Sequence, residues 1–310
     1  MRILFTGASS FTGYWFAKEL AEQGHQVFAT FRSSLGDYDG IRGERVHRLI
    51  PLCEPIFGCP FGSSQFLHCL ETQRFDVLCH HAAQVENYKS DDFDAIDALV
   101  HNTCHIREVI SLLKGRRLII TGSITEKGEG KCEEQNHAFS PYGLSKFLTS
   151  ELIEFECHRQ GLPLGKFVIP NPFGPYEEER FTSWLIKNWF RGDKPQVKTP
   201  YYTRDNIHVT LLAKAYAHFV TQDPPALFFR LNPSGYISTQ EAFTEKFAEK
   251  MTAYLQIPCE FSVYPQTEFS EPKVRVNTNP VDAEQFDWDE ERAWRKLAEY
   301  YRNYYPVGIL

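Results

Sequence analysis

The sequence predicts an α/β fold in which a doubly wound parallel sheet is joined to a smaller C-terminal lobe. The first observation is that short apolar runs alternate with stretches of helical spacing, which is typical of βα units. These runs are Arg2–Phe5, Gln26–Phe31, Phe75–Cys79, Arg117–Thr121, Gly165–Ile169 and Leu227–Leu231. The second observation is the opening sequence MRILFTGASSFTG, in which the first run leads directly into a glycine-rich turn. Runs this apolar indicate strands that are covered on both faces, as in a parallel sheet.

The opening turn, Thr6–Gly13, is followed by a helical pattern over Tyr14–Gln23. A strand, a glycine turn and a helix N-terminus together present backbone N–H groups to a phosphate. Gly7 permits the tight turn, and Gly13 permits close contact between helix and strand. The usual middle glycine is replaced by Ser10, whose hydroxymethyl group lies near the expected pyrophosphate but can also donate a hydrogen bond. Unless this is an ordinary βα turn, the residues expected to contact a dinucleotide are Gly7, Ser9, Ser10, Phe11, Thr12 and Gly13.

The composition indicates a globular protein and disfavours several function classes. The 310 residues suit a large α/β domain with additions, and the formal net charge of −7 argues against nucleic-acid binding. No apolar stretch reaches the roughly 18 residues of a membrane span, and the first run starts at residue 2, so we expect no membrane contact and no signal peptide. Eight cysteines without a CxxC pair suggest free thiols, a cytoplasmic location and no metal site, although Cys53 and Cys59 could pair or bind a metal.

The end of the second apolar run bears on the choice of dinucleotide. An acidic residue at this position holds the ribose 2′-hydroxyl and selects NAD. Here Phe31 is followed by Arg32 and Ser33, with no acid. A guanidinium can pair with a 2′-phosphate in a bidentate way, and a serine can add a hydrogen bond. We therefore expect NADP as the cofactor, with NAD as the alternative if Arg32 is an ordinary surface arginine.

The third apolar run ends in two histidines and two alanines, His80 to Ala83. Small residues after a strand allow the backbone to pass close to a bound cofactor, so Ala82 and Ala83 are candidate contacts. His80 is either a further cofactor contact or a satisfied histidine at a strand end.

The remaining segments predict several helices and one further strand. A peripheral strand is expected at Arg45–Ile50, and a loop rich in Gly, Glu and Lys extends to Asn136. The expected helices are Ser64–Glu71, Asp91–Leu113, residues 141–160, Phe181–Arg191, Thr210–Thr221, Thr239–Leu255 and Asp289–Tyr304.

The helix that begins near residue 141 carries the chemistry. Ser140 is a suitable N-cap, and Tyr142 and Lys146 are four residues apart, so they share one helix face. A phenol titrates near ~10, and a neighbouring ammonium favours the phenolate. Tyr142 can therefore exchange a proton with a sugar or alcohol oxygen. Ser123, at the end of the preceding apolar run, can hydrogen-bond the same oxygen.

These features resemble the extended short-chain dehydrogenase/reductase family, a Rossmann-type family of nucleotide-sugar epimerases, dehydratases and reductases. Ser123, Tyr142 and Lys146 match its catalytic triad. The other matching segments, which together cover nearly the whole chain, are Thr6–Gly13, Asp76–Ala83, Asn102, Asn171–Pro175, Arg204–Val209 and Asn232–Glu241.

The resemblance implies an NAD(P)-dependent oxidoreductase or epimerase that acts on a nucleotide sugar. The implied step is hydride transfer at C4 of the hexose, by a 4-keto reductase or a 4-epimerase. Lys146 would also bind the nicotinamide ribose. Asn171 and Arg204 would hold the substrate's diphosphate, unless Arg204 forms a surface ion pair with Asp205.

Departures from the family pattern bear on the reaction. Family dehydratases usually carry acidic residues directly after the triad serine, where this sequence has Ile124 and Thr125, with Glu126 one place later. Elimination of water needs a general acid for the leaving hydroxyl, so dehydration is disfavoured. The usual Tyr-Gly is replaced by Lys127-Gly128, and an arginine common before the Asn-Pro-Phe-Gly-Pro segment is replaced by Val168.

The expected organisation is a dinucleotide-binding domain of residues 1–171 plus about 206–233, with a substrate-binding lobe of about 172–205 plus 234–310. The resemblance also implies a homodimer through the helices at about 91–113 and 141–160. A second hypothesis is a non-catalytic NADP-binding sensor or scaffold of the same fold. The complete set of Ser123, Tyr142 and Lys146 disfavours it, because sensors of this fold often lose the tyrosine.

Overall fold

The computed structural model describes residues 1–132 and 138–305, and the chain divides into two compact units. Unit 1 comprises Met1–Glu129, Gln135–Ile169 and Ala213–Asn232, and unit 2 comprises Gly130–Glu134, Pro170–Leu212 and Pro233–Leu310. The end of the loop expected up to Asn136 lies outside the described residues. Every described helix is too short or too polar to cross a bilayer.

Unit 1 contains a seven-stranded sheet in which all neighbouring strands are parallel. Its order is β11-β7-β5-β4-β1-β2-β3. The strands are β1 (Arg2–Thr6), β2 (Gln26–Thr30), β3 (Glu54–Ile56), β4 (Val77–His80), β5 (Arg117–Ser123), β7 (Leu164–Ile169) and β11 (Phe228–Leu231). The chain starts in the middle, runs outward to β3 and then returns to β4 on the other side of β1. This reversal confirms the doubly wound sheet and places a switch point between β1 and β4.

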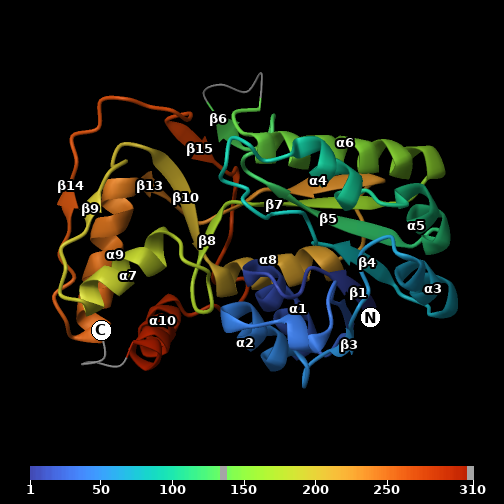
Figure 1. The fold of residues 1–310 in the computed structure, drawn as a ribbon, viewed down its shortest axis with the longest axis horizontal. Helices are drawn as coiled ribbons and strands as arrows, with labels where there is room; N and C mark the ends of the chain where they lie inside the picture. The colour runs from blue at the N-terminus through green and yellow to red at the C-terminus, as the bar shows by residue number, and fades with distance from the viewer. Residues whose placement is uncertain (133–137, 306–310) are drawn as a thin grey trace. The chain divides into compact units, whose positions relative to one another are not determined.

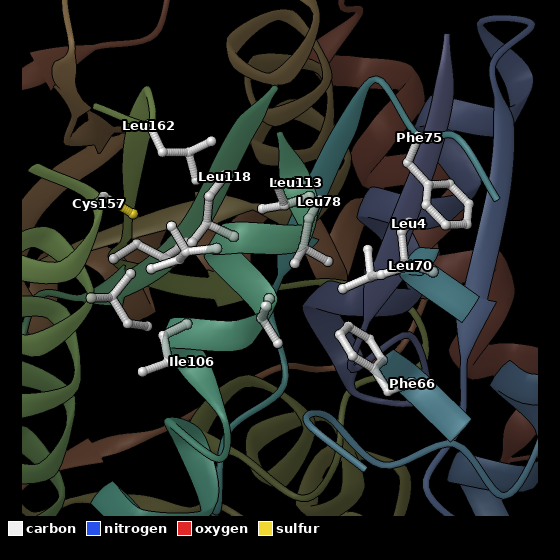
Figure 2. Packing of buried hydrophobic residues seen from close by; sticks show 14 of the residues in the cluster. Leu4, Phe66, Leu70, Phe75, Leu78, Ile106, Leu113, Leu118, Cys157 and Leu162 are labelled. Carbon is white, nitrogen blue, oxygen red and sulfur yellow. The ribbon is translucent and has the colours of Figure 1, made fainter. Parts of the chain in front are cut away.

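Helices cover both faces of this sheet, as Figure 1 shows. One face carries α1 (Phe11–Glu22), α2 (Gly40–Leu49) and α8 (Val209–Thr221), and the other carries α3 (Ser64–Thr72), α4 (Ala95–Asn102), α5 (Ile106–Leu113) and α6 (Pro141–Gln160). Successive residues of β1 point to opposite faces. Leu4 joins the apolar cluster under α3, α5 and α6 (Figure 2), whereas Phe5 lies 6.2 Å from the ring of Tyr216 on α8. The Tyr216 ring in turn stacks on Phe16 of α1 at 4.0 Å.

The segment expected as a peripheral strand, Arg45–Ile50, forms the end of α2 instead, and this prediction was wrong. Arg45, Val46 and Leu49 are all fully buried, and their spacing of one and four residues matches one side of a helix. Here the apolar contact that stabilises the segment is the packing of α2 on α1. The third strand of the sheet begins only at Glu54.

The single helix expected over Asp91–Leu113 is two helices, α4 and α5, so this prediction was also wrong. The chain breaks at His105, which adopts φ of +50° and whose Nδ1 lies 2.8 Å from the carbonyl oxygen of Gly62. Two apolar residues of α4, Ile96 and Val100, are 74% and 62% exposed. The apolar spacing in the sequence therefore continues through the break at His105, although the helix does not. The contact with Gly62, far away in the chain, is visible only in the structure.

Unit 2 is built on a sheet of order β13-β10-β15-β6, with β8 also paired to β10. The strands are β6 (Lys131–Cys132), β8 (Asn171–Phe173), β10 (Thr203–His208), β13 (Tyr236–Thr239) and β15 (Val274–Val276). Two smaller pairs join β9 (Gln196–Val197) to β14 (Ser262–Val263) and β12 (Pro233–Ser234) to β16 (Asn279–Pro280). Residues 206–212 group with this unit, which differs from the expected boundary near 206, because β10 takes all its partners from the sheet of unit 2.

Three helices complete unit 2: α7 (Phe181–Phe190), α9 (Gln240–Leu255) and α10 (Glu290–Tyr304). They confirm the helices expected at Phe181–Arg191, Thr239–Leu255 and Asp289–Tyr304 to within a residue. Aromatic side chains of these helices, among them Trp189, Phe247 and Trp294, form the core of the unit together with Phe173 of β8.

Candidate active site

The opening glycine turn lies directly against the end of β4. Gly7 has φ of +78°, and a Cβ at this position would lie 2.7 Å from the backbone nitrogen of Ala82. A Cβ on Gly13 would lie 2.1 Å from the carbonyl oxygen of Gly7. Neither contact leaves room for a side chain, so the turn needs glycine at both positions. The β1–α1 connection therefore has the close backbone approach expected of a dinucleotide site.

Ser10, the residue that replaces the usual middle glycine, points into this turn. It is the N-cap of α1, and its hydroxyl accepts a hydrogen bond from Gly13 N at 3.1 Å. The same hydroxyl donates to Gly7 O at 2.9 Å. The hydroxymethyl group therefore stabilises the turn from inside, which answers the question that the sequence left open about Ser10.

His81 contacts two side chains of the glycine turn and was not identified from the sequence. Its Nε2 lies 3.0 Å from Ser10 Oγ and 3.1 Å from Thr12 Oγ1, and its Nδ1 lies 2.9 Å from Thr121 Oγ1. Because the Ser10 hydroxyl gives its proton to Gly7, we assign the imidazole hydrogen to Nε2 and the acceptor role to Nδ1. Burial lowers the pKa of His81 to about 3, so the ring is neutral. It links α1 to β5 across the end of β4.

His80, a candidate cofactor contact, has both ring nitrogens engaged within unit 1. Nδ1 lies 3.0 Å from Thr6 Oγ1, and Nε2 lies 2.9 Å from the carbonyl oxygen of Asn102. Burial lowers the pKa of His80 to about 4. The Thr6 hydroxyl also accepts a hydrogen bond from Ala82 N at 2.9 Å. Of the two interpretations left open, this geometry supports the satisfied histidine, which fixes the backbone at Ala82 through Thr6.

Two arginines of unit 1, Arg45 and Arg32, have different environments. Arg45 on α2 is fully buried, and its Nε donates to the carbonyl oxygen of Ser9 at 3.0 Å. The strand predicted at Arg45–Ile50 gave no indication of this contact, which depends on the helical conformation of α2. Arg32, after β2, is exposed and has no ion-pair partner in the described part of the chain. Beside it, Ser33 N donates to the hydroxyl of Tyr38 at 3.2 Å.

Lys146 is anchored on the strand that ends in Ser123. Its Nζ donates to the carbonyl oxygen of Thr121 on β5 at 2.7 Å, and its side chain is buried. Burial lowers the pKa of Lys146, the charge of Glu126 raises it and that of Lys166 lowers it further. The ammonium therefore lies at the carboxyl end of β5, next to the end of β4.

Tyr142 lies one turn before Lys146 on α6. Ser140 caps this helix, as expected, by accepting from Gly143 N at 3.1 Å. The Tyr142 ring is half-buried, with its centroid 5.2 Å from the ring of Tyr88 and 6.0 Å from that of Phe93. A Cβ on Gly143 would lie 2.4 Å from the carbonyl oxygen of Thr125, so the first turn of α6 lies against the turn that follows β5.

Ser123 is the last residue of β5 and begins that turn. Its Oγ lies 2.8 Å from Thr125 Oγ1 and accepts from Thr125 N at 3.2 Å. Because β1, β4 and β5 are parallel neighbours, their carboxyl ends meet at one edge of the sheet. The structure thus brings the predicted triad and the glycine turn to the same edge of unit 1.

A buried ion cluster lies next to this edge and was also missed. Glu126 Oε2 lies 2.6 Å from Lys166 Nζ, and the same ammonium lies 2.7 Å from Glu129 Oε1. Glu129 Oε2 accepts from Asn232 Nδ2 at 2.8 Å, and Arg230 lies 3.5 Å from Oε1. The one feature of the sequence that pointed to this cluster was Lys166, a charged residue inside the apolar strand β7.

The two residues that the resemblance assigns to the substrate's diphosphate lie in unit 2. Asn171 on β8 is in register with Asn206 on β10, and its side-chain nitrogen is buried without a hydrogen-bond partner among the described residues. Arg204 on β10 is buried as well, with its guanidinium 4.2 Å from the ring of Tyr202 and 3.1 Å from Glu271 Oε2.

The alternative reading of Arg204 as a surface partner of Asp205 was wrong. Adjacent residues of a strand point to opposite faces. Arg204 Nη1 donates to the carbonyl oxygens of Thr203, Pro272 and Lys273, at 3.0, 3.1 and 3.2 Å. Asp205 instead accepts from Gly235 N at 2.8 Å and Asn277 N at 3.0 Å. Burial lowers the pKa of Arg204 to about 10, and the guanidinium keeps its charge near neutral pH.

Comparison with known proteins decides the family. Residues 3–227 match the family model described as "NAD dependent epimerase/dehydratase family". The chain belongs to this family. No curated protein matches the sequence.

Solved structures of nucleotide-sugar enzymes share the fold of this family member. The UDP-glucose 4-epimerase of Thermotoga maritima, solved with UDP-glucose, aligns over 98% of this chain and 99% of its own, with a TM-score of 0.74 and 19% identity. The dTDP-glucose 4,6-dehydratase of Bacillus anthracis, solved with NAD, aligns over 98% and 97%, with a TM-score of 0.72 and 17% identity. The UDP-Glc/GlcNAc 4-epimerase of Campylobacter jejuni aligns over 97% and 99%, with a TM-score of 0.69 and 15% identity. At these identities the likeness establishes the fold alone.

The residues of unit 1 fit the dinucleotide that the family name implies. The turn leaves no space for a Cβ at Gly7 or Gly13, and the Ser10 hydroxyl is hydrogen-bonded within the turn to Gly7 O and Gly13 N. The positive end of α1 begins at this turn, which favours an anionic group. These features of the turn are compatible with a bound diphosphate.

Proposed function

We propose that the protein is an NAD(P)-dependent enzyme that transfers hydride at C4 of the hexose of a nucleotide sugar, as a 4-keto reductase or a 4-epimerase. One observation carries this proposal. Lys146 is fixed on β5 by Thr121, with Tyr142 one helical turn before it and Ser123 at the end of the same strand. This arrangement supplies a proton donor, a cation and a hydroxyl at the edge of the sheet where the dinucleotide turn lies.

The chain's own residues handle the proton. When bound, a nicotinamide dinucleotide supplies or accepts the hydride. In the oxidative direction, C4 loses its hydride and the Tyr142 phenolate takes the proton of the C4 hydroxyl. In the reductive direction, the Tyr142 hydroxyl gives that proton to the oxygen as C4 gains hydride. Lys146 stabilises the phenolate by its positive charge and also binds the nicotinamide ribose, and Ser123 hydrogen-bonds the same substrate oxygen.

The proposed cofactor is NADP, with NAD as the alternative. The proposed contacts are Gly7, Ser9, Ser10, Phe11, Thr12, Gly13, Arg32, Ser33, Ala82, Ala83 and Lys146, with His80 acting through Thr6. Arg32 is exposed and is not held by a carboxylate of the described chain, which supports a role in binding a 2′-phosphate. Several of the similar solved structures are complexes with NAD, among them the dehydratase of Bacillus anthracis, which supports the alternative. Affinities of the protein and of Arg32→Ala for NADPH and NADH discriminate the two, because only NADPH binding should weaken in the variant.

A dehydratase is disfavoured within this proposal. Ile124 and Thr125 supply no carboxylate directly after Ser123, and Thr125 is hydrogen-bonded to Ser123. The next carboxylate, Glu126, is buried and bonded to Lys166. A carboxylate held in this way is a poor general acid for a leaving hydroxyl. NADP preference would favour the reductase, because NADPH is consumed in each turnover, whereas an epimerase recycles its cofactor.

The substrate contacts and the assembly are also part of the proposal. Asn171 and Arg204 are proposed to hold the diphosphate of the sugar nucleotide, and the unpartnered amide nitrogen of Asn171 supports this. A homodimer through α4 and α6 is supported by exposed apolar side chains, among which Ile96 and Val100 lie one turn apart on α4 and Phe155 on α6 is 58% exposed. We place this enzyme in the cytoplasm.

The test is turnover of a panel of UDP- and dTDP-hexoses and their 4-keto forms, followed by NAD(P)H absorbance and by mass spectrometry. Tyr142→Phe should lower kcat by at least about 100-fold, which is the scale of general acid–base catalysis. Tyr88→Phe, which removes a hydroxyl from the neighbouring ring, is the matched control and should keep most of the activity. Binding of NADPH without turnover of any member of the panel would favour the sensor or scaffold instead.

A further inference from the structure

We propose that Glu126 is a positioning residue that fixes the turn carrying Ser123 in register with the face of α6 carrying Tyr142 and Lys146. This inference rests on the proposed function and adds to it a residue that does not touch substrate. It also assigns a role to Lys166 on β7. Neither the glycine turn nor the predicted triad explains why this buried lysine is present.

The first part of the argument is the bond between Glu126 and Ser123. The Glu126 Oε1 atom accepts from Ser123 N at 2.7 Å, and Glu126 N donates back to Ser123 O at 3.0 Å. The two residues are therefore joined in both directions across a single turn. The direction of the Ser123 side chain depends on the backbone of this turn, and Glu126 holds that backbone at its first residue.

The second part is the bond between Glu126 and α6. The Ser150 hydroxyl donates to Glu126 Oε2 at 3.0 Å, and Ser150 is 3% exposed. Tyr142, Lys146 and Ser150 are spaced four residues apart, so they lie along one face of the helix. The same carboxylate therefore contacts the turn that carries Ser123 and the helix face that carries the other two triad residues.

The third part is the anchor of the carboxylate itself. Lys166 Nζ on β7 lies 2.6 Å from Glu126 Oε2, so both carboxylate oxygens have partners. The space for this pair comes from Gly122, since a Cβ there would lie 2.7 Å from Lys166 Cε and 3.0 Å from Glu126 Oε1. A buried carboxylate bonded on both oxygens to three different elements has little freedom to move, which is the property that positioning requires.

The charges around Glu126 come from four elements. Lys146 lies on α6, Lys166 on β7 and Arg230 on β11, while Glu129 lies on the segment after Glu126 itself, and Glu154 on α6 is also influenced by Lys166. Of the two carboxylates bonded to Lys166, only Glu126 also contacts Ser123 and influences Lys146. Glu129 therefore offers a matched control, because its loss removes the same kind of bond to Lys166 and leaves the Ser123 turn bonded.

The experiment compares Glu126→Gln with Glu129→Gln in the full chain, with steady-state kinetics on the substrate found by the panel. Glu126→Gln should lower kcat by about 10- to 100-fold, the cost of slight misplacement of reacting groups, and leave KM close to that of the wild type. Glu129→Gln should keep kcat close to wild type. The alkaline limb of the kcat–pH profile should also move to lower pH in Glu126→Gln alone, because the charge that raises the pKa of Lys146 is lost. Equal kinetic effects of the two variants would overturn the proposal.

Two further measurements keep the test decisive. If Glu126→Gln does not fold, Ser150→Ala replaces it, because this change removes only the hydrogen bond between α6 and the Glu126 carboxylate. Ser150→Ala should lower kcat without changing KM. An unchanged kcat would overturn the proposal. Hydrogen exchange of the ligand-free protein needs no activity. Peptides that cover 121–126 should exchange faster in Glu126→Gln than in Glu129→Gln, and equal exchange would contradict the role of Glu126. If the wild type turns over no sugar nucleotide, the proposed function fails, and the exchange result still decides the positioning role.

Discussion

Two neighbouring strand ends of unit 1 are stabilised in opposite ways. At the end of β4, His80 and His81 are neutral and hold the dinucleotide turn through hydroxyls and carbonyls. At the end of β5, Glu126, Lys166 and Glu129 are charged and hold the turn of Ser123 through ion pairs. The charged network influences the proton equilibrium of Lys146 beside it, because Glu126 raises the pKa of this lysine and Lys166 lowers it. Under the proposed function, the neutral network would serve dinucleotide binding and the charged network would serve proton transfer.

The largest effect is expected from removing the cation of the charged network. Lys166→Met leaves Glu126 and Glu129 buried without their shared ammonium, which should lower the free energy of unfolding by about 3–5 kcal/mol. Urea unfolding followed by circular dichroism measures this. The triple variant Lys166→Met, Glu126→Gln, Glu129→Gln removes all three charges of the network, leaves no buried carboxylate without its ammonium and should recover much of the loss. If Lys166→Met were as stable as the wild type, the ion pairs of Lys166 with Glu126 and Glu129 would not contribute to stability.

The neutral network should respond to acid. The pKa of His80 is lowered from 6.5 to about 4 by burial, so between these values the unfolded chain binds more protons than the folded one. Stability from this residue is therefore complete above pH 6.5 and is lost as pH falls toward 4, by an amount on the order of 3 kcal/mol. His81, with its pKa lowered to about 3, acts in the same direction. Unfolding free energies at pH 7, 6, 5 and 4 measure the slope.

The control for this acid effect is His81→Leu, which should make the dependence on pH between 6.5 and 4 shallower. An unchanged slope in the variant would assign the effect to other groups. Glu177 in unit 2 is one group with the opposite sign, because burial raises its pKa to about 7. For that carboxyl the folded chain binds more protons between pH 4.5 and 7, so its contribution to stability falls as pH rises through this window.

A smaller effect tests whether Ser10 and His81 act as a pair. Ser10→Gly restores the usual glycine and should cost only a few tenths of a kcal/mol as a cap. His81→Leu removes the imidazole that contacts the hydroxyls of Ser10, Thr12 and Thr121 and should cost about 2 kcal/mol. The loss of unfolding free energy in the double variant should be smaller than the sum of the two single losses. The difference, which is the coupling energy, should be roughly 1 kcal/mol. Additive losses would mean that the 3.0 Å contact between Ser10 and His81 carries no energy.

The sequence alone was sufficient for features that depend on short spacing along the chain. The glycine turn, the Ser140 cap and the position of Tyr142 and Lys146 one turn apart on a helix all follow from backbone geometry within one or two turns. The alternation of strands and helices predicted the doubly wound parallel sheet, but it did not predict the order of the seven strands.

The features that escaped the sequence analysis join residues far apart in the chain. Ser10 and His81 are 71 positions apart, and Glu126 and Lys166 are 40 apart, so no local pattern links them. The break between α4 and α5 depends on the carbonyl oxygen of Gly62, which is 43 positions from His105. Helix α2 was read as a strand because its few apolar residues gave too short a pattern to separate the two periods.

The most direct test of the central claim is the fate of a labelled hydride. The protein is incubated with a 4-keto nucleotide sugar and NADPH in which both hydrogens at C4 of the nicotinamide are deuterium, and the product is analysed by mass spectrometry. The account predicts one deuterium on C4 of the hexose with the wild type and at least about 100-fold slower incorporation with Tyr142→Phe. Incorporation at the wild-type rate in Tyr142→Phe would contradict the role of the phenol, and product without deuterium at C4 would contradict hydride transfer at that carbon.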